Sequence, residues 1–177
     1  MSLLRWLVLL CSALLFATAG AGAAGLPAAY AAMVVQPVET PERFEFDLTA
    51  ALQRARRERK RLFVYLGAND CPFCRRYEAF LDRNAAELVR HFAKAYLVVD
   101  LRSRLAVQAK LLHIRIGNSS LPYAEFQRSI GDERARLLVY PSVWLLDAKA
   151  QPLMQMPAGT GTFETVAEQL EILRLEQ

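Results

Sequence analysis

Two cysteines three positions apart, Cys71 and Cys74, stand where an apolar run gives way to a segment of helical character. The run is residues 62–66, and its apolar and aromatic composition is typical of a buried strand. Pro72 suits the first turn of a helix, because a residue there needs no partner for its backbone N–H. A strand that leads into a helix through this pair puts the Cys71 sulfur at the helix N-terminus, where unpaired N–H groups and the helix dipole favour a thiolate. Since the thiolate is the form that attacks disulfides, the spacing predicts a redox site.

The first 23 residues predict an export signal. Arg5 supplies a positive charge, residues 6–19 are apolar, and small residues near the end of the segment suit a cleavage site. An uncleaved anchor is the alternative, with a membrane tether through residues 6–35, because no charged residue follows Arg5 for more than thirty positions. In both cases we expect the folded part to face the periplasm, an oxidising compartment.

The third cysteine, Cys11, lies within this signal. Its removal would leave Cys71 and Cys74 as the only cysteines of the mature chain. The pair would then have no internal competitor for bridging. We therefore expect its partners to be protein disulfides or dithiols, together with an upstream thiol electron donor or acceptor.

Length and charge limit the remaining possibilities. The 177-residue chain without its signal suits one domain, expected over residues 44–177, with the Ala- and Pro-rich residues 24–43 as a tether. A formal net charge of +4 is a weak bias that indicates no partner. Basic residues cluster over 54–61 around Glu58, and this pattern favours a solvated helix face over a nucleic-acid site.

Apolar periodicity predicts the order helix, strand, helix, strand, helix, insert, strand, strand, helix. Asp47 is expected to cap the first helix. The insert, about residues 114–138, is too long for a simple connection and contains a loop at 117–120 and a helical stretch from 122. The expected helices are 48–60, one from Pro72 to about Asp82, 84–92, 102–113 and one from Thr162, and the expected strands are 62–67, 95–99, 143–146 and 152–156, the last two as a hairpin.

This order, with the cysteines at the first strand-to-helix junction, resembles the thioredoxin fold over about residues 44–175. Tyr140-Pro141-Ser142, directly before the strand at 143–146, is similar to the family's cis-proline loop, and Gly159 resembles the glycine that follows its hairpin. The resemblance implies an α/β fold in which helices flank a central mixed sheet, here with an insert before the cis-proline loop. It also implies thiol:disulfide exchange with partner proteins and no cofactor or metal.

The resemblance implies a role for each residue of the motif. Cys71 is expected to be the solvent-facing nucleophile, and Cys74, one turn into the helix, to resolve the mixed disulfide. The backbone of Tyr140, before Pro141, is expected to bind an extended substrate peptide. The residues between the cysteines, Pro72 and Phe73, are expected to shape the surface around Cys71 and to tune the redox potential.

The chain departs from thioredoxin at two positions near the motif. Tyr65 stands six residues before Cys71, where the family has a buried carboxylate, so the usual proton acceptor for Cys74 is missing. Asp70 replaces the tryptophan just before Cys71 and either raises the pKa of that thiol through its like charge or serves as a loop or capping residue. Glu78, one helical turn after Cys74, is a further candidate for proton transfer.

Other interpretations of the cysteines remain open at this stage. A structural zinc site would need two more ligands, but His91 and His113 lack paired spacing. A copper metallochaperone would combine the cysteines with His113 or with the Met154/Met156 pair, since soft sulfur ligands bind Cu(I). A non-catalytic scaffold of thioredoxin fold in an envelope complex is the third possibility.

The insert has two interpretations of its own. Tyr123, Phe126 and Ile130 follow a helical spacing, so they either select a partner at the active-site face or anchor the insert to the core. The leading hypothesis is a periplasmic thiol:disulfide oxidoreductase that acts as a reductant rather than an oxidant.

Overall fold

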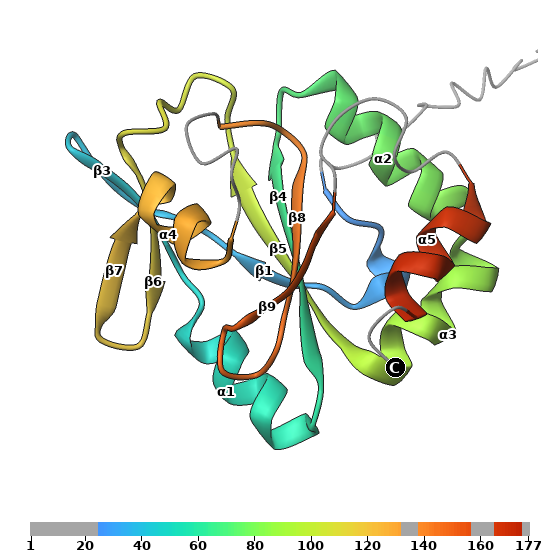
Figure 1. The fold of residues 1–177 in the computed structure, drawn as a ribbon. Coiled ribbons are helices and arrows are strands. Elements are labelled where there is room, and N and C mark those ends of the chain that lie inside the picture. The colour runs from blue at the N-terminus through green and yellow to red at the C-terminus, as the bar shows by residue number, and fades with distance from the viewer. Residues whose placement is uncertain (1–24, 132–137, 157–164, 175–177) are drawn as a thin grey trace, which may run out of the picture.

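The central sheet of this computed structural model has five strands in the order β1-β5-β4-β8-β9 (Figure 1). The structure describes residues 25–131, 138–156 and 165–174. β1, β5 and β4 run parallel, β8 is antiparallel to β4, and β9 is antiparallel to β8. The strands are β1 (Met33–Val35), β4 (Arg61–Ala68), β5 (Tyr96–Ser103), β8 (Ser142–Leu146) and β9 (Pro152–Met156). This mixed sheet and its flanking helices confirm the predicted thioredoxin fold.

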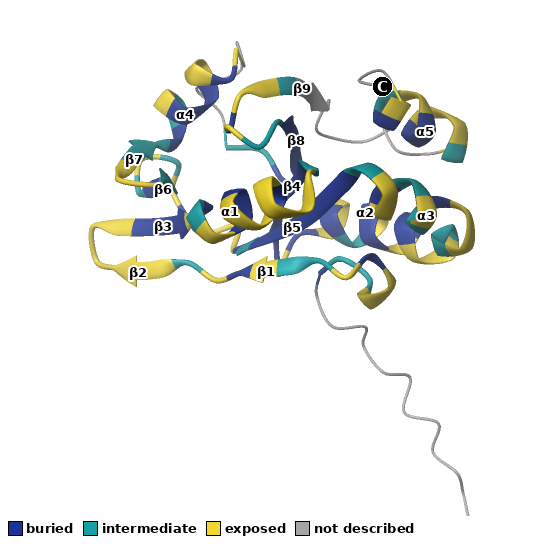
Figure 2. Cartoon of the chain, turned by 90° about the horizontal axis from the view of Figure 1, so that it is seen from below, coloured by how far each residue is buried: buried dark blue, intermediate teal, exposed yellow. Residues whose placement is uncertain are grey.

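Helices cover both faces of the sheet, with α2, α3 and α5 gathered on one side and α1 on the other (Figures 1 and 2). Side chains of β4 alternate between the two faces. Leu62, Val64 and Leu66 belong to the core that includes α1, whereas Phe63 and Tyr65 belong to the core that includes α2, α3 and α5. A strand buried on both faces produces the continuous apolar run seen in the sequence. The helices are α1 (Thr49–Glu58), α2 (Pro72–Arg83), α3 (Ala85–Ala95) and α5 (Val166–Arg174).

A second, smaller sheet has the order β2-β3-β6-β7 and adjoins a short helix, α4. Phe126 of α4 packs edge-on against Trp144 of β8, with ring centroids 5.2 Å apart. Tyr123 and Ile130 are buried as well, so these insert side chains anchor it to the core and are not exposed to a partner. The elements are β2 (Val38–Thr40), β3 (Arg43–Asp47), β6 (Leu112–Ile116), β7 (Ser119–Pro122) and α4 (Tyr123–Ser129).

The prediction of a tether over residues 24–43 is wrong for most of that segment. It contains a 3-10 turn, η1 (Ala28–Tyr30), followed by β1 and β2. The Tyr30 ring packs edge-on against Phe92 at 5.0 Å, and its hydroxyl donates to the Leu81 carbonyl at 2.9 Å. Strands of three residues are too short to show a hydrophobic period, and β1 is held by backbone pairing with β5 that leaves no sequence signal.

The prediction of a helix over residues 102–113 is also wrong. β5 continues to Ser103, and β6 begins at Leu112. Leu112 and Ile114 alternate with period two and lie opposite Phe44 and Phe46 of β3. The apolar residues thus have the period of a strand and not that of a helix, and the strand that pairs with them lies some seventy residues away in the chain.

The helices α1, α2 and α3 and the strands β4, β5, β8 and β9 follow the prediction within a few residues, including the antiparallel β8-β9 hairpin. No strand was predicted at β3, and β7 lies partly where a loop was predicted. The Asp47 carboxylate accepts the Thr49 N–H at the start of α1 at 2.8 Å. Glu58, the last residue of that helix, is exposed and pairs with Arg54 within the helix and with Lys60 just beyond it. The predicted signal over 1–23, the glycines at 159 and 161 and the start of a helix at Thr162 lie outside the described residues. Within the described ranges, no helix is both long and apolar enough to span a bilayer.

Candidate redox site

Cys71 lies at the junction between β4 and α2, as the N-cap residue of the helix. Its sulfur accepts the backbone N–H of Cys74 at 3.1 Å, and its carbonyl accepts the N–H of Arg75 at 3.2 Å. Pro72 follows as the first helical residue, where its missing N–H leaves no unsatisfied donor. The Cys71 sulfur thus occupies the place at the helix N-terminus where partial positive charge favours an anion.

Cys74 lies one turn further along, with no exposed surface. Its sulfur accepts the backbone N–H of Ala68 at 3.4 Å. Burial raises the pKa of the Cys74 thiol to about 12. Both Cys71 and Cys74 are free thiols in this structure, so it represents the reduced pair.

Tyr140 and Pro141 form the opposite wall of the site. The bond between them is cis, and the Tyr140 carbonyl lies 3.7 Å from the Cys71 sulfur, which donates to it. The Tyr140 hydroxyl shares a hydrogen bond of 2.6 Å with the Ser103 hydroxyl at the end of β5. Burial raises the pKa of Tyr140 to about 12, so this hydroxyl stays protonated at neutral pH. Residues nearly seventy positions apart are thus brought into contact at the cysteine pair.

Cys71 is less accessible than the sequence prediction assumed. Only 2% of the residue is exposed, against the expected solvent-facing nucleophile. Its sulfur contacts both the Tyr140 carbonyl and the Cys74 N–H.

The three other predicted neighbours of the cysteines lie on the surface. Pro72 is exposed, and so is Phe73, with 47% of its surface accessible. Asp70 is exposed and accepts the Leu105 N–H at 2.8 Å, which ties the turn before Cys71 to the loop after β5. Of its two interpretations, the structure supports the role of a loop residue for Asp70.

Tyr65 and Glu78 meet behind Cys74. The Tyr65 hydroxyl donates to a Glu78 carboxylate oxygen at 2.9 Å, and it is also a hydrogen-bond partner of the Cys74 thiol. Glu78 is 6% exposed and pairs with Arg75 at 2.7 Å and with Arg102 at 3.6 Å. A carboxylate therefore lies near Cys74, although it comes from α2 rather than from β4.

Sequence reasoning did not single out Asp100 and Arg102, which complete this buried cluster from β5. Arg102 pairs with Asp100, and the Leu26 N–H donates to the same Asp100 carboxylate at 3.0 Å. Burial raises the pKa of Asp100 to about 6. A signal for the pair was present, because two charges two positions apart in an apolar strand lie on one face and need partners there.

No protein-family model matches the sequence, and no curated protein matches it either. Among solved structures, the exposed lipoprotein thioredoxin Etrx1 of Streptococcus pneumoniae strain TIGR4 is similar, with 16% sequence identity and a TM-score of 0.36. The match covers 66% of this chain and 84% of that chain. The fold of this chain is therefore assigned from its own strand order and pairing.

The described residues bring no metal site together around the cysteines. They contain no group of three or more His, Cys, Asp or Glu side chains able to hold an ion. His113 belongs to β6 in the second sheet, where its Nδ1 lies 2.9 Å from the Leu111 carbonyl. The cysteines thus have no third histidine or carboxylate ligand in the described part of the chain.

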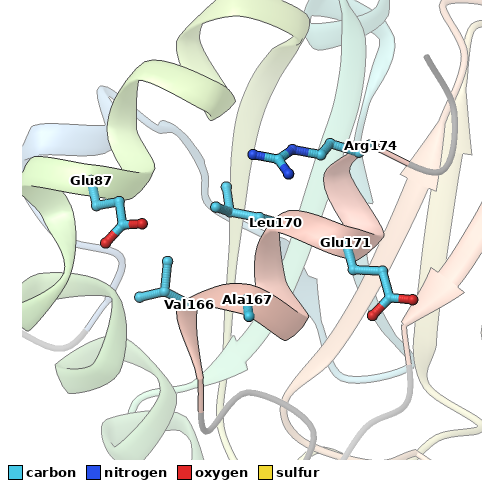
Figure 3. A pocket seen from close by; sticks show the side chains of 6 residues that line it. All are labelled: Glu87, Val166, Ala167, Leu170, Glu171 and Arg174. Atoms are coloured by element: carbon cyan, nitrogen blue, oxygen red, sulfur yellow. The ribbon is translucent and has the colours of Figure 1, made fainter.

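A hollow of about 480 Å³ lies between α3 and α5 (Figure 3). None of its lining residues is a predicted site residue, and it contains neither cysteine. The lining consists of Glu87, Val166, Ala167, Leu170, Glu171 and Arg174. The hollow is therefore separate from the cysteine pair.

Proposed function

We propose that the chain is a periplasmic thiol:disulfide oxidoreductase of thioredoxin type that exchanges disulfides with partner proteins through Cys71 and Cys74. One observation carries the proposal. The Cys71 sulfur accepts an N–H at the start of α2 and faces the Tyr140 carbonyl before a cis-proline, with a second thiol behind it. This arrangement offers one sulfur to attack a partner and a second to release it.

Exchange in the reducing direction has two steps. The Cys71 thiolate attacks one sulfur of a partner disulfide, whose S–S bond breaks as a mixed disulfide forms, and the departing partner sulfur takes a proton. Cys74 then loses its proton and attacks the Cys71 sulfur, which forms the Cys71–Cys74 disulfide and releases the second partner thiol. Two electrons pass from the cysteine pair to the partner, which leaves as a dithiol.

Partner recognition is assigned to the surface around Tyr140. An extended peptide beside the Tyr140 backbone can pair with its polar groups as an added strand does, with the Tyr140 carbonyl released from the Cys71 thiol. Phe73 offers an exposed ring next to the cysteines, which an apolar partner side chain can cover. Pro141 supplies no N–H, so the pairing is left to the residue before it.

We propose a reductant rather than an oxidant. A cysteine pair is strongly oxidising when its reduced form is stabilised. That stabilisation comes from hydrogen-bond donors or cations around the thiolate of the nucleophilic cysteine. Within the described residues, no Lys, Arg or His side chain hydrogen-bonds to the Cys71 sulfur, and a carbonyl faces it. We expect a redox potential below about −200 mV, on the reducing side of the known range.

Export is part of the same proposal. Residues 1–23 would direct the chain to the periplasm, with a membrane tether through residues 6–35 if the signal is retained. An upstream thiol donor must then return the Cys71–Cys74 disulfide to the dithiol.

Insulin reduction by the full chain, together with its potential measured against glutathione, tests the proposal. Cys71→Ser should abolish the activity, and Cys74→Ser should accumulate mixed disulfides at Cys71 that mass spectrometry can identify. Wild-type protein that reduces no disulfide while Cys71 can be alkylated would contradict the oxidoreductase function. A potential near about −120 mV would contradict only the reducing direction.

A further inference from the structure

We propose that Tyr65 and Glu78 form the proton path of Cys74: the Tyr65 hydroxyl accepts the thiol proton, and the Glu78 carboxylate receives the proton that the hydroxyl gives up. The inference rests on the proposed function, because it concerns the step in which Cys74 attacks the mixed disulfide. Tyr65 touches the reacting sulfur and is the catalytic residue of the two. Glu78 acts through Tyr65 and is a positioning residue.

The contacts of the Tyr65 hydroxyl have the direction that such a path needs. The hydroxyl donates to Glu78 at 2.9 Å, and the Cys74 sulfur is its other hydrogen-bond neighbour. Because a phenol has a single proton, the oxygen can only accept from the thiol while that proton is given to Glu78. A proton can therefore enter at the oxygen while the hydroxyl proton leaves toward the carboxylate. Once Cys74 is a thiolate, the same hydroxyl can turn and donate to its sulfur.

Cys74 needs such help because its surroundings favour the neutral thiol. Burial raises the pKa of Cys74 to about 12, so the thiol is almost wholly protonated at neutral pH. Burial also holds the pKa of Tyr65 far above its ordinary value. The Tyr65 hydroxyl therefore gives up its proton only as it receives another, which is the behaviour of a relay and not of a free base.

Glu78 links this buried pair to solvent. Its carboxylate pairs with Arg75, which is 34% exposed, and lies near Arg102, which is largely buried. The two guanidinium groups face the carboxylate from α2 and β5. A proton that arrives at Glu78 thus lies one side chain from bulk water, on the side of Arg75.

The position of Tyr65 depends on Gly67, two residues further along the same face of β4. A Cβ atom on Gly67 would lie 2.6 Å from Cε1 of the Tyr65 ring and 2.9 Å from its hydroxyl oxygen. Those distances are shorter than side chains tolerate, so only glycine lets the ring lie there. Gly67 therefore provides the space that directs the hydroxyl toward Glu78.

Residues of β5 lie beside Tyr65 and Gly67, and Gly25 lies against one of these residues. Asp100 lies opposite Tyr65 and Arg102 opposite Gly67 in the β4-β5 register, and the two form an ion pair. Gly25 lies against the Arg102 guanidinium, where any side chain would overlap it. The titratable and charged groups that face the path are Cys71, Cys74, Arg75, Tyr77 and Glu78 of α2, Tyr65 of β4, Asp100 and Arg102 of β5, and Tyr140.

In the mixed disulfide, the Cys74 proton passes to Tyr65 as the Tyr65 proton passes to Glu78. The thiolate electron pair forms the Cys74–Cys71 bond, the bond from Cys71 to the partner sulfur breaks, and that sulfur leaves with the bonding electrons and takes a proton from water. Glu78 then releases its proton to solvent, so the relay returns to its starting state.

The test follows the reaction of the reduced full chain with Ellman's reagent by stopped flow. The first thionitrobenzoate is released as Cys71 attacks, and the second as Cys74 attacks the resulting mixed disulfide. Tyr65→Phe and Glu78→Gln should each slow the second release at least tenfold at pH 7 and leave the first unchanged. The second release should then accelerate tenfold per pH unit, because hydroxide must remove the thiol proton.

Two matched variants report on packing alone. Tyr30→Phe removes another buried hydroxyl from the same core, and Glu45→Gln neutralises another buried, ion-paired glutamate, in the second sheet. Neither should alter the second release. If Tyr65→Phe fails to fold, Gly67→Ala and Glu78→Gln carry the test, since both disturb the path and keep the phenol.

The outcomes separate the two proposals. A second release at the wild-type rate and pH profile in folded Tyr65→Phe and Glu78→Gln overturns the proton path and leaves the proposed function standing. Slowing by Tyr30→Phe or Glu45→Gln as large as by the path variants also overturns it. Wild-type protein that shows the relay behaviour but reduces no protein disulfide overturns the proposed function alone.

Discussion

Asp100 should make the folded protein less stable as pH rises from about 4 to 7. Its carboxylate is buried beside Tyr65, and burial raises its pKa from 3.8 to about 6, although the Leu26 N–H and Arg102 act in the opposite direction. The folded state then binds the Asp100 proton more tightly than the unfolded chain does. Its stabilising contribution is fully present below pH 3.8 and is lost as pH rises through 6.

The size of the effect follows from the shift. Each pKa unit corresponds to about 1.4 kcal/mol, so the whole contribution is about 3 kcal/mol. Between pH 4.5 and 7 the free energy of unfolding should fall by about 2 kcal/mol on account of this group. Asp100→Asn removes the titration and also leaves Arg102 without its charged partner. The loss of the charged partner of Arg102 changes the free energy of unfolding of the variant by a similar amount at each pH in the range, so it does not alter the pH dependence of the difference.

The measurement is urea unfolding of wild type and Asp100→Asn between pH 4.5 and 7 at constant ionic strength, followed by the fluorescence of the buried Trp144. The difference in unfolding free energy, wild type minus variant, should fall by about 2 kcal/mol across the range. A difference that stays constant within about 0.5 kcal/mol, or that grows with pH, would refute the reasoning.

Three further predictions concern packing and charge. Phe92→Ala should lower the free energy of unfolding in urea by about 3–5 kcal/mol, because the ring is buried and packs against two other rings. Replacing the exposed Phe73 by alanine should change it by less than about 0.5 kcal/mol. Equal losses in the two variants would contradict the packing assignment. Gly67→Ala should cost about 1–3 kcal/mol by overpacking against Tyr65, and a thermal midpoint equal to that of wild type would argue against that close contact. Burial raises the pKa of Glu45, but hydrogen bonds from Ser120 and Arg115 lower it by more, so the pKa lies below its ordinary value of 4.5. The contribution of Glu45 to the free energy of unfolding should therefore be present above pH 4.5 and be lost on acidification. The difference in unfolding free energy between wild type and Glu45→Gln should therefore grow with pH, whereas the difference for Asp100→Asn falls. A difference for Glu45→Gln that also falls with pH in urea unfolding would count against this prediction.

Local pattern was sufficient where one segment carries its own signal. The run before Cys71, the proline that opens α2, and the apolar run of β8 with the turn that follows it each specify their element within about ten residues. The position of Cys71 at a helix N-terminus follows from those local patterns. Tyr140 before Pro141 was placed by resemblance to a family and not by periodicity.

The residues that the sequence alone did not place are those held by pairing across the sheet. β1 has only three residues and is defined by its partner β5, so no period in its own sequence reveals it. The period of two in β6 is too short to stand out from a helical pattern without its partner β3. The burial of Cys71 depends on a carbonyl nearly seventy residues away. The sequence by itself thus determined a cysteine pair at a strand-to-helix junction. Only the tertiary structure, by setting the β4-β5 register and packing α2 on that face, decided that Tyr65, Glu78, Asp100 and Arg102 meet behind Cys74.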